Sequence, residues 1–315
     1  MKRAEREDKR DVIIDCDPGH DDAIALLLAF ARPELNVRGV TVVAGNHRLE
    51  KTSHNTLKLL EFAGIETDIY AGYEKPLMRE LITAPDVHGE SGLDGPELPE
   101  PQGRIEEEHA VRFIIEEIRN CENEVTLIPT GPLTNIAAAL KGAPDIIDRI
   151  EEIILMGGAV KGGNRTAAAE FNILVDPEAA HMVFEADIEK TMVGLDVTRE
   201  AMFYPEDIEE LKELGNPVAE MAGELLEFFV GYHRERLDME GCPLHDPLAV
   251  AAALDESVIK TEYLPVRVEN EGRYTTGATV VDYDGITFGE PNVHVALEVD
   301  APRFRHIVKK ALTEY

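Results

Sequence analysis

The sequence predicts an α/β fold: a mainly parallel central sheet with helices on both faces, followed by a small C-terminal antiparallel meander. Short apolar segments alternate with helical patterns over residues 12–195, and this alternation is typical of parallel sheets covered on both sides. The chain has 315 residues, of which 44% are hydrophobic, so it can bury one large core. No repeat, linker or break in composition divides it, and we expect a single domain over residues 1–315.

Five segments are expected to be buried strands, because nearly continuous apolar runs indicate strands that are covered on both faces. These strands are Val12–Ile14, Val37–Val43, Val125–Pro129, Ile153–Met156 and Thr191–Leu195. The helices expected over the same part of the chain are Ala23–Ala31, Lys51–Ala63, Glu107–Asn120, Asn135–Leu140 and Pro177–Glu185.

The C-terminal third has a different pattern. A long helix is expected over Ala219–Asp238, and a closing helix over Pro302–Leu312. Between them we expect three strands of a meander, at Leu264–Val268, Ala278–Asp282 and Val293–Val299. At the other end, Met1–Arg10 is charged and lacks the apolar segment of a signal peptide, so it is expected to be a flexible tail.

The charge balance excludes some classes of partner. With 62 acidic against 31 basic residues, the net charge is −31, which disfavours binding to nucleic acids or anionic membranes. The acidic residues are spread along the chain, and we hypothesise adaptation to high salt, the alternative being an ordinary acidic enzyme. No apolar run is long enough to span a membrane. Cys16, Cys121 and Cys242 are far apart, which favours a reducing, cytoplasmic location without disulfides or zinc.

Four carboxylates fall within eight residues where the first expected strand gives way to a helix: Asp15, Asp17, Asp21 and Asp22. One Asp could simply cap the helix, but four like charges beside a buried strand repel each other strongly. A hard divalent cation with oxygen ligands would neutralise them. Other polar residues follow neighbouring strands, where ligands of parallel sheets bind, and we expect one site at that edge.

The motifs together resemble a known family. In order along residues 11–312, they are Asp15–Asp22, Thr130–Asn135, Met156–Ala159, Glu170–Asn172 with Asp176–Ala179, and His245–Ala249. This set resembles the nucleoside hydrolases of the inosine–uridine preferring group. The resemblance implies calcium-dependent hydrolysis of the N-glycosidic bond of ribonucleosides, in nucleoside salvage or catabolism, by a homodimer or homotetramer.

The resemblance also implies the reacting groups. Asp17, Asp22, Asp246 and the backbone carbonyl of Thr130 would bind the metal, and such hard oxygen ligands suit Ca²⁺ better than zinc. Asp17 would act as the general base for the attacking water. His245 would act as the general acid that protonates the departing base.

The remaining implied residues contact the substrate. Those on the ribose side are Asp21, Asn46, Asn164, Glu170 and Asn172, with Asp246 shared with the metal. The others are His88, Met156, Phe171, Tyr232 and Arg236; Tyr232 and Arg236 share a helix face. Glycines around His88 suggest a mobile flap. The chain has no tryptophan, whereas purine-specific members of the family sandwich the base between tryptophans. We therefore expect a broad or pyrimidine-preferring enzyme.

Three other functions remain open at this point. Asp15 and Asp17 after an apolar strand also suit phosphoryl transfer by an aspartyl nucleophile, but the cluster would repel a phosphate. The protein could instead bind a nucleoside or calcium without catalysis. It could also hydrolyse a non-standard ribosyl compound, which only a substrate panel separates from the leading hypothesis.

Overall fold

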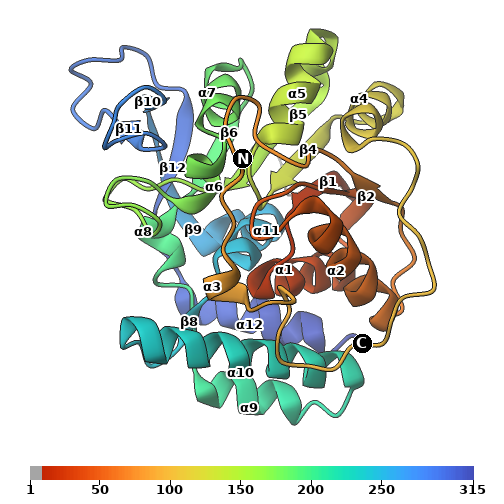
Figure 1. Cartoon of the computed structure of the whole chain (residues 1–315). Coiled ribbons are helices and arrows are strands. Elements are labelled where there is room, and N and C mark those ends of the chain that lie inside the picture. Colours follow the sequence, from red (N-terminus) through yellow and green to blue (C-terminus); the bar gives the residue numbers. More distant parts are fainter. Residues whose placement is uncertain (1–8) are drawn as a thin grey trace.

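The computed structural model describes residues 9–315, which form a sheet between two layers of helices (Figure 1). The sheet has eight strands in the order β3-β2-β1-β4-β5-β6-β12-β9. All neighbours pair in parallel except β12 and β9, which are antiparallel. The strands are β1 (Arg10–Cys16), β2 (Leu35–Val42), β3 (Ile69–Ala71), β4 (Val125–Pro129), β5 (Ile150–Met156), β6 (Lys190–Val193), β9 (Ile259–Leu264) and β12 (Val293–Val299).

The two faces of the sheet pack into separate cores. Along β1, the side chains of Val12 and Ile14 belong to one hydrophobic core and that of Ile13 to the other, as the two-residue period of a strand requires. The first core is covered by α1 (His20–Ala31), α9 (Pro205–Lys212), α10 (Pro217–Leu237), α11 (His245–Leu254) and α12 (Ala301–Leu312). The second is covered by α4 (Ala110–Asn120), α5 (Thr134–Gly142) and α7 (Pro177–Glu185). The predicted parallel sheet with helices on both faces is confirmed.

The predicted meander is only partly present. Val293–Val299 is a strand, but it pairs with β6 and β9 in the central sheet, where Val293 and Val295 complete the second core. Pro265 separates β9 from β10 (Val266–Val268), because proline lacks the N–H that a continuous strand would donate. The small antiparallel sheet therefore consists of β10 and β11 (Thr279–Val281) alone.

Several shorter elements complete the fold, and the sequence patterns did not predict them. They are α3 (Pro85–His88), η1 (Pro144–Arg149), α6 (Phe171–Val175), α8 (Leu195–Thr198), β7 (Met202–Phe203), β8 (Cys242–Pro243) and η2 (Glu256–Val258). Helix α2 itself (Leu49–Phe62) lies where it was expected. In the part of the chain that is described, no helix is long and apolar enough to cross a membrane.

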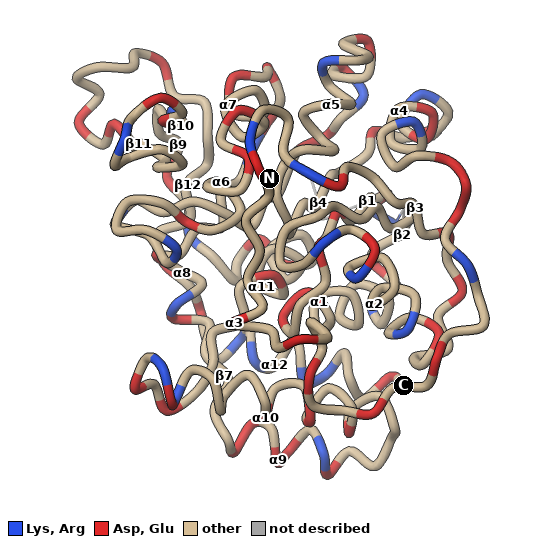
Figure 2. The backbone as a smooth tube through the Cα atoms, in the orientation of Figure 1, with Lys and Arg blue, Asp and Glu red and all other residues tan. Residues whose placement is uncertain are grey.

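The predicted N-terminal tail lies mostly outside the described residues, since residues 1–8 are not among them. Its last residue belongs to the fold: Arg10 begins β1, and its Nε donates a hydrogen bond of 2.8 Å to Thr126 Oγ1 on β4. Figure 2 shows acidic residues on most elements, so the excess negative charge is not confined to one region.

Candidate active site

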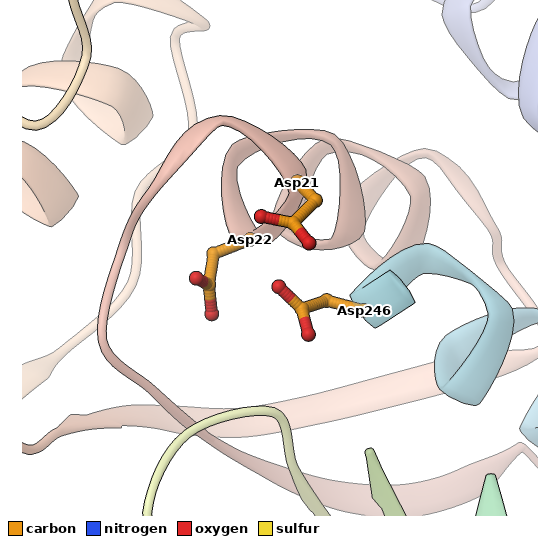
Figure 3. A group of neighbouring side chains, drawn as sticks. All are labelled: Asp21, Asp22 and Asp246. Carbon is orange, nitrogen blue, oxygen red and sulfur yellow. The ribbon is translucent and has the colours of Figure 1, made fainter. Parts of the chain in front are cut away.

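Three buried carboxylates meet beyond the carboxyl ends of β1 and β4. Asp21 and Asp22 lie in the first turn of α1, and Asp246 lies in the first turn of α11. Figure 3 shows the three side chains pointing toward one another from these two helices. One carboxylate oxygen from each lies within 4.8 Å of the others. The packing of α1 and α11 on the same face of the sheet thus joins residues that are far apart in the sequence.

Hydrogen bonds fix the orientation of Asp22. Its Oδ2 accepts from the backbone N–H of Gly19 (3.0 Å), which completes the N-terminal cap of α1. Its Oδ1 accepts from the hydroxyl of Thr130 (2.8 Å), the residue that follows β4. The Thr130 carbonyl in turn accepts a hydrogen bond of 2.7 Å from Asn172 Nδ2. The carboxylate is therefore aimed by backbone and side-chain donors from two different strand ends.

Asp17 lies beside this cluster, in the turn between β1 and α1. Its Oδ2 accepts a hydrogen bond of 2.6 Å from the backbone N–H of Asn46, whereas its Oδ1 is buried without a hydrogen-bond partner. Two glycines pack against this carboxylate. A Cβ at Gly45 would lie 2.1 Å from Oδ2 and a Cβ at Gly131 would lie 2.5 Å from Oδ1, so any larger residue would displace Asp17.

The electrostatics of these groups favour a cation. Burial, and next repulsion from Asp22, raises the pKa of Asp17 well above its ordinary value and the pKa of Asp21 to about 7. Burial and the neighbouring carboxylates also raise the pKa of Asp246. Buried carboxylates are stable in a fold when a positive charge offsets their desolvation. The carboxylate and carbonyl oxygens gathered here, together with the unpartnered Oδ1 of Asp17, fit a hard divalent cation.

A cavity of about 520 Å³ opens next to the cluster. It is large enough for a small ligand of the size of a nucleoside. Among the residues predicted from the sequence, it is lined by Asp21, Asn46, His88, Thr130, Met156, Asn164, Glu170, Phe171, Asn172, Tyr232, His245 and Asp246. The structure therefore brings together nearly all of the predicted substrate-contacting residues.

Three predicted residues do not line the cavity. Asp17 and Asp22 are fully buried beneath its floor. Arg236 is exposed on α10, although Tyr232 one turn earlier faces the cavity. Arg236 lies one turn further along α10 and its side chain is exposed outside the cavity lining. The shared helix face thus did not establish a contact for Arg236.

The ribose-side residues hold each other through backbone hydrogen bonds. Glu170 caps α6: Oε1 accepts from the N–H of Asn172 (2.9 Å), and Oε2 accepts from the N–H groups of Ile173 and Gly158 (both 3.1 Å). Asn172 Nδ2 also lies 3.2 Å from the carbonyl of Met156, at the end of β5. Burial raises the pKa of Glu170 above its ordinary value, while these N–H donors oppose that rise.

The opposite wall carries aromatic and imidazole rings. His88, at the end of α3, stacks on His20, with ring centroids 5.5 Å apart, and on Phe229 of α10, at 5.6 Å. His20 Nε2 lies 2.8 Å from the carbonyl oxygen of Asp94, and the Nδ1 atoms of His20 and His88 are 3.2 Å apart. This stack gives the cavity a flat, mostly apolar wall that suits a planar ring.

His245 begins α11 beside Asp246. Its Nδ1 lies 2.7 Å from the hydroxyl of Thr198, and burial lowers its pKa to about 3. An imidazole in water titrates near neutrality, but desolvation keeps this one neutral at pH 7. When the Thr198 hydroxyl donates to Nδ1, the one remaining N–H is on Nε2.

Two arginines of the cavity had no signal in the sequence. Arg165 lies in the loop over residues 161–169, and Arg199 is the residue after α8. Neither lies in a recognisable motif. Conversely, Cys242 is buried in the first core, as expected for a packing residue.

Comparison with known proteins agrees with this geometry. The sequence model described as "Inosine-uridine preferring nucleoside hydrolase" matches residues 12–306. The chain belongs to this family. It is a nucleoside N-ribohydrolase, an enzyme of nucleoside hydrolysis, and the resemblance noted in the sequence is confirmed.

Relatives match nearly the whole length of this nucleoside hydrolase. The pyrimidine-specific ribonucleoside hydrolase RihA of Klebsiella pneumoniae is 47% identical over 306 residues, covering 96% of this chain and 98% of the relative. The protein of the same name from Photobacterium profundum is 48% identical over 309 residues, covering 97% and 99%. A solved structure, the purine-preferring ribonucleoside hydrolase from Gardnerella vaginalis, superposes with a TM-score of 0.91 at 33% identity, covering 96% of this chain and 98% of that one.

Proposed function

We propose that this nucleoside hydrolase cleaves pyrimidine ribonucleosides into ribose and free base, with Ca²⁺ held among Asp17, Asp22, Asp246 and the carbonyl of Thr130. The observation that carries the proposal is the group of buried carboxylates at the floor of a nucleoside-sized cavity. Asp21 belongs to the same group, with a carboxylate oxygen within 4.8 Å of those of Asp22 and Asp246, and it also lines the cavity where the ribose would bind. The RihA relatives, which are pyrimidine-specific by name, and the absence of tryptophan support the base preference.

The family resemblance supports Asp17 as the general base that receives a proton from the attacking water. Among the described residues its Oδ1 has no hydrogen-bond partner, so this oxygen can bind the cation or accept a proton. When bound, Ca²⁺ would neutralise the carboxylates and supply the positive charge that lowers the pKa of the water. Asp22, held by Gly19 and Thr130, keeps the cluster in place during the reaction.

Cleavage of the bond between ribose and base passes through an oxocarbenium-like sugar. The negative charge of Asp21 and its neighbours favours the positive charge that develops on the ribose. Asn46 and Asn172 offer amide groups for the ribose hydroxyls, and Asn164 and Glu170 lie where the 5′-hydroxyl would be held. Hydrogen bonds to the 2′-hydroxyl explain why such a site selects ribose over 2′-deoxyribose.

The departing base would lie against the ring wall of His88 and Phe229. His245 stabilises negative charge on the base by donating its Nε2–H, and Tyr232 offers a further hydroxyl at the same end of the cavity. Because the pKa of His245 is lowered, this donor is a neutral imidazole in the free enzyme. We also propose, from the family resemblance, that the active form is a homodimer or homotetramer.

A base-release assay tests the proposal directly. Uridine, cytidine, inosine, adenosine and guanosine are each incubated with the enzyme in CaCl₂ or in EDTA, and the free base is measured by chromatography. We expect release of uracil and cytosine with calcium and loss of release in EDTA. Asp17→Asn should remain folded by circular dichroism but release no base. Release that persists in EDTA would contradict the metal assignment, and exclusive release of purines would contradict the base preference.

A further inference from the structure

Two loops that are distant in sequence are joined across the mouth of the active-site cavity. The ribose-side loop, residues 161–169, carries Arg165, whose Nη1 lies 3.3 and 3.4 Å from the two carboxylate oxygens of Asp86. Its Nη2 donates a hydrogen bond of 3.2 Å to the carbonyl of Thr83. Both acceptors belong to the His88 segment, residues 83–95, and Arg165 and Asp86 themselves line the cavity.

Each side of this bridge is connected to substrate-contacting residues. On the ribose side, Asn164 is the neighbour of Arg165 and accepts a hydrogen bond of 2.9 Å from the N–H of Phe171. The guanidinium of Arg165 also lies over the Phe171 ring, 6.0 Å from its centroid. On the base side, Asp86 is on the same short helix as His88. The bridge therefore joins the segment that carries Asn164 to the segment that carries His88.

The ribose-side loop has few internal restraints of its own. The N–H groups of Asn164, Arg165 and Thr166 all point to one acceptor, the carbonyl of Ala169, at 3.3–3.4 Å. A loop of this kind opens at low free-energy cost unless other contacts hold it. The His88 segment is held more firmly, because its backbone carbonyls contact side chains of α1 and of the segment around α2: Gly89 with His47 (2.9 Å), Ser91 with Asn55 (2.9 Å) and Asp94 with His20 (2.8 Å).

Further contacts tie each segment to the rest of the fold. Arg199 Nη2 donates a hydrogen bond of 2.7 Å to the carbonyl of Gly163, which ties the ribose-side loop to the end of α8. The N–H of Ala84 donates a hydrogen bond of 2.9 Å to the carbonyl of Asn46, which ties the start of the His88 segment to the loop after β2. Arg165, through Asp86 and Thr83, joins the two segments to each other.

We infer that Arg165 is a positioning residue: by binding Asp86 and Thr83 it holds the His88 segment at a fixed distance from the Asn164 loop. The inference rests on the proposed function for the roles of Asn164 and His88. It goes beyond that function because neither Arg165 nor Asp86 is required for the chemistry itself. Loss of the bridge lets the Asn164 loop move relative to the His88 segment, which lowers kcat as well as raising KM.

A double-mutant cycle tests the inference in the full-length enzyme. Arg165→Gln and Asp86→Asn are made singly and together, and kcat and KM for uridine are measured with calcium. We expect each single variant to lower kcat/KM by about 3- to 10-fold, the range for an exposed ion pair with one additional charged hydrogen bond. The kcat/KM of the double variant should be no lower than that of the more impaired single variant. The charge-reversed pair, Arg165→Glu with Asp86→Arg, should recover part of the loss.

A matched control separates this effect from the general loss of a surface ion pair. Arg119 of α4 pairs with Asp145 of η1 through two hydrogen bonds of 2.8 Å, and neither residue lines the cavity. Arg119→Gln should leave kcat/KM unchanged. Amide hydrogen exchange supplies a readout that does not depend on activity: in Arg165→Gln, exchange should be at least about 3-fold faster in residues 83–86 and 161–169 and unchanged elsewhere.

The outcomes are distinguishable. Additive losses in the cycle, or wild-type kcat/KM with unchanged exchange in Arg165→Gln, would overturn the positioning role. If the wild-type enzyme released no base from any ribonucleoside, the proposed function would fail. The exchange comparison would then still decide whether Arg165 holds the two loops together.

Discussion

Replacement of Asp246 by Asn should change the stability of the protein in opposite directions with and without metal. In EDTA, Asp246→Asn removes one of three carboxylates that lie buried within 4.8 Å of one another. In CaCl₂, the same substitution removes a proposed ligand. We therefore expect the variant to be more stable than the wild type in EDTA and less stable in calcium.

The size of the effect follows from the distance. Two unit charges 4.8 Å apart repel by about 3.5 kcal/mol at an effective dielectric constant of about 20. Asp246 faces two such neighbours, but partial protonation of the cluster limits the repulsion that persists. We expect a net gain of about 2 kcal/mol in EDTA, which corresponds to a rise in Tm of about 3 °C for a protein of this size. In calcium at about 100 times Kd, the wild type gains about 2.7 kcal/mol that the variant largely loses.

The gain in EDTA should also depend on pH. Burial, followed by repulsion from Asp21 and Asp22, raises the pKa of Asp246 above its value in the unfolded chain. The folded wild type then binds a proton that the unfolded chain releases, so its stability falls as the pH rises above the unfolded pKa. Asn does not titrate. The advantage of Asp246→Asn in EDTA should therefore be larger at pH 8 than at pH 5.

Thermal unfolding, monitored by circular dichroism, measures the change in Tm of Asp246→Asn both in EDTA and in CaCl₂. Asp148→Asn, which removes one exposed carboxylate from η1, controls for the change in net charge and should behave like the wild type. If Asp246→Asn were less stable than the wild type in EDTA, or if calcium raised the Tm of both proteins equally, the idea that these carboxylates form a cation site would be wrong.

Two further predictions concern the departing base and the charge of the surface. His245→Ala should lower kcat/KM for uridine at least about 100-fold more than for p-nitrophenyl riboside, whose leaving group needs no hydrogen-bond donor; equal losses would show that His245 does not assist departure. Because 62 acidic residues are spread over the chain, the Tm should rise as KCl increases from low to multimolar concentration; a flat or falling Tm would indicate an ordinary acidic enzyme without adaptation to salt.

The sequence predicted the central part of the fold because burial there leaves a simple pattern. The strands that carry the site are apolar on both faces, so Val12–Ile14 and Val125–Pro129 stand out as uninterrupted runs. Elements without such a pattern were missed. Helix α11 is buried nearly all round and has no polar face that would show a helical period. Strand β9 is exposed over its four central residues and lies at the edge of the sheet, so it lacks the alternation of a half-buried strand.

The candidate site also contains residues that the sequence predicted and residues that it could not predict. The carboxylates were predictable because Asp21 and Asp22 are adjacent in one motif, and a buried concentration of charge has few physical explanations. The residues that shape the space around these carboxylates could be found only in the structure. Gly45 and Gly131 have no distinguishing pattern in the sequence, yet each leaves room for one oxygen of Asp17.

The remaining part of the site lies on loops, and this division has a functional consequence. The proposed metal ligands Asp22 and Asp246 lie on helices α1 and α11, which pack into the main core, so their charges are held rigidly. Of the residues proposed to face the base, His245 shares α11 with Asp246, whereas His88 and Tyr232 lie on the His88 segment and on α10, where contacts such as Arg165–Asp86 set the geometry. We therefore expect a change near His88 or Tyr232 to alter the accepted base without disturbing the carboxylate cluster. This separation accounts for how a pyrimidine-specific relative and a purine-preferring structural neighbour share one fold with this chain.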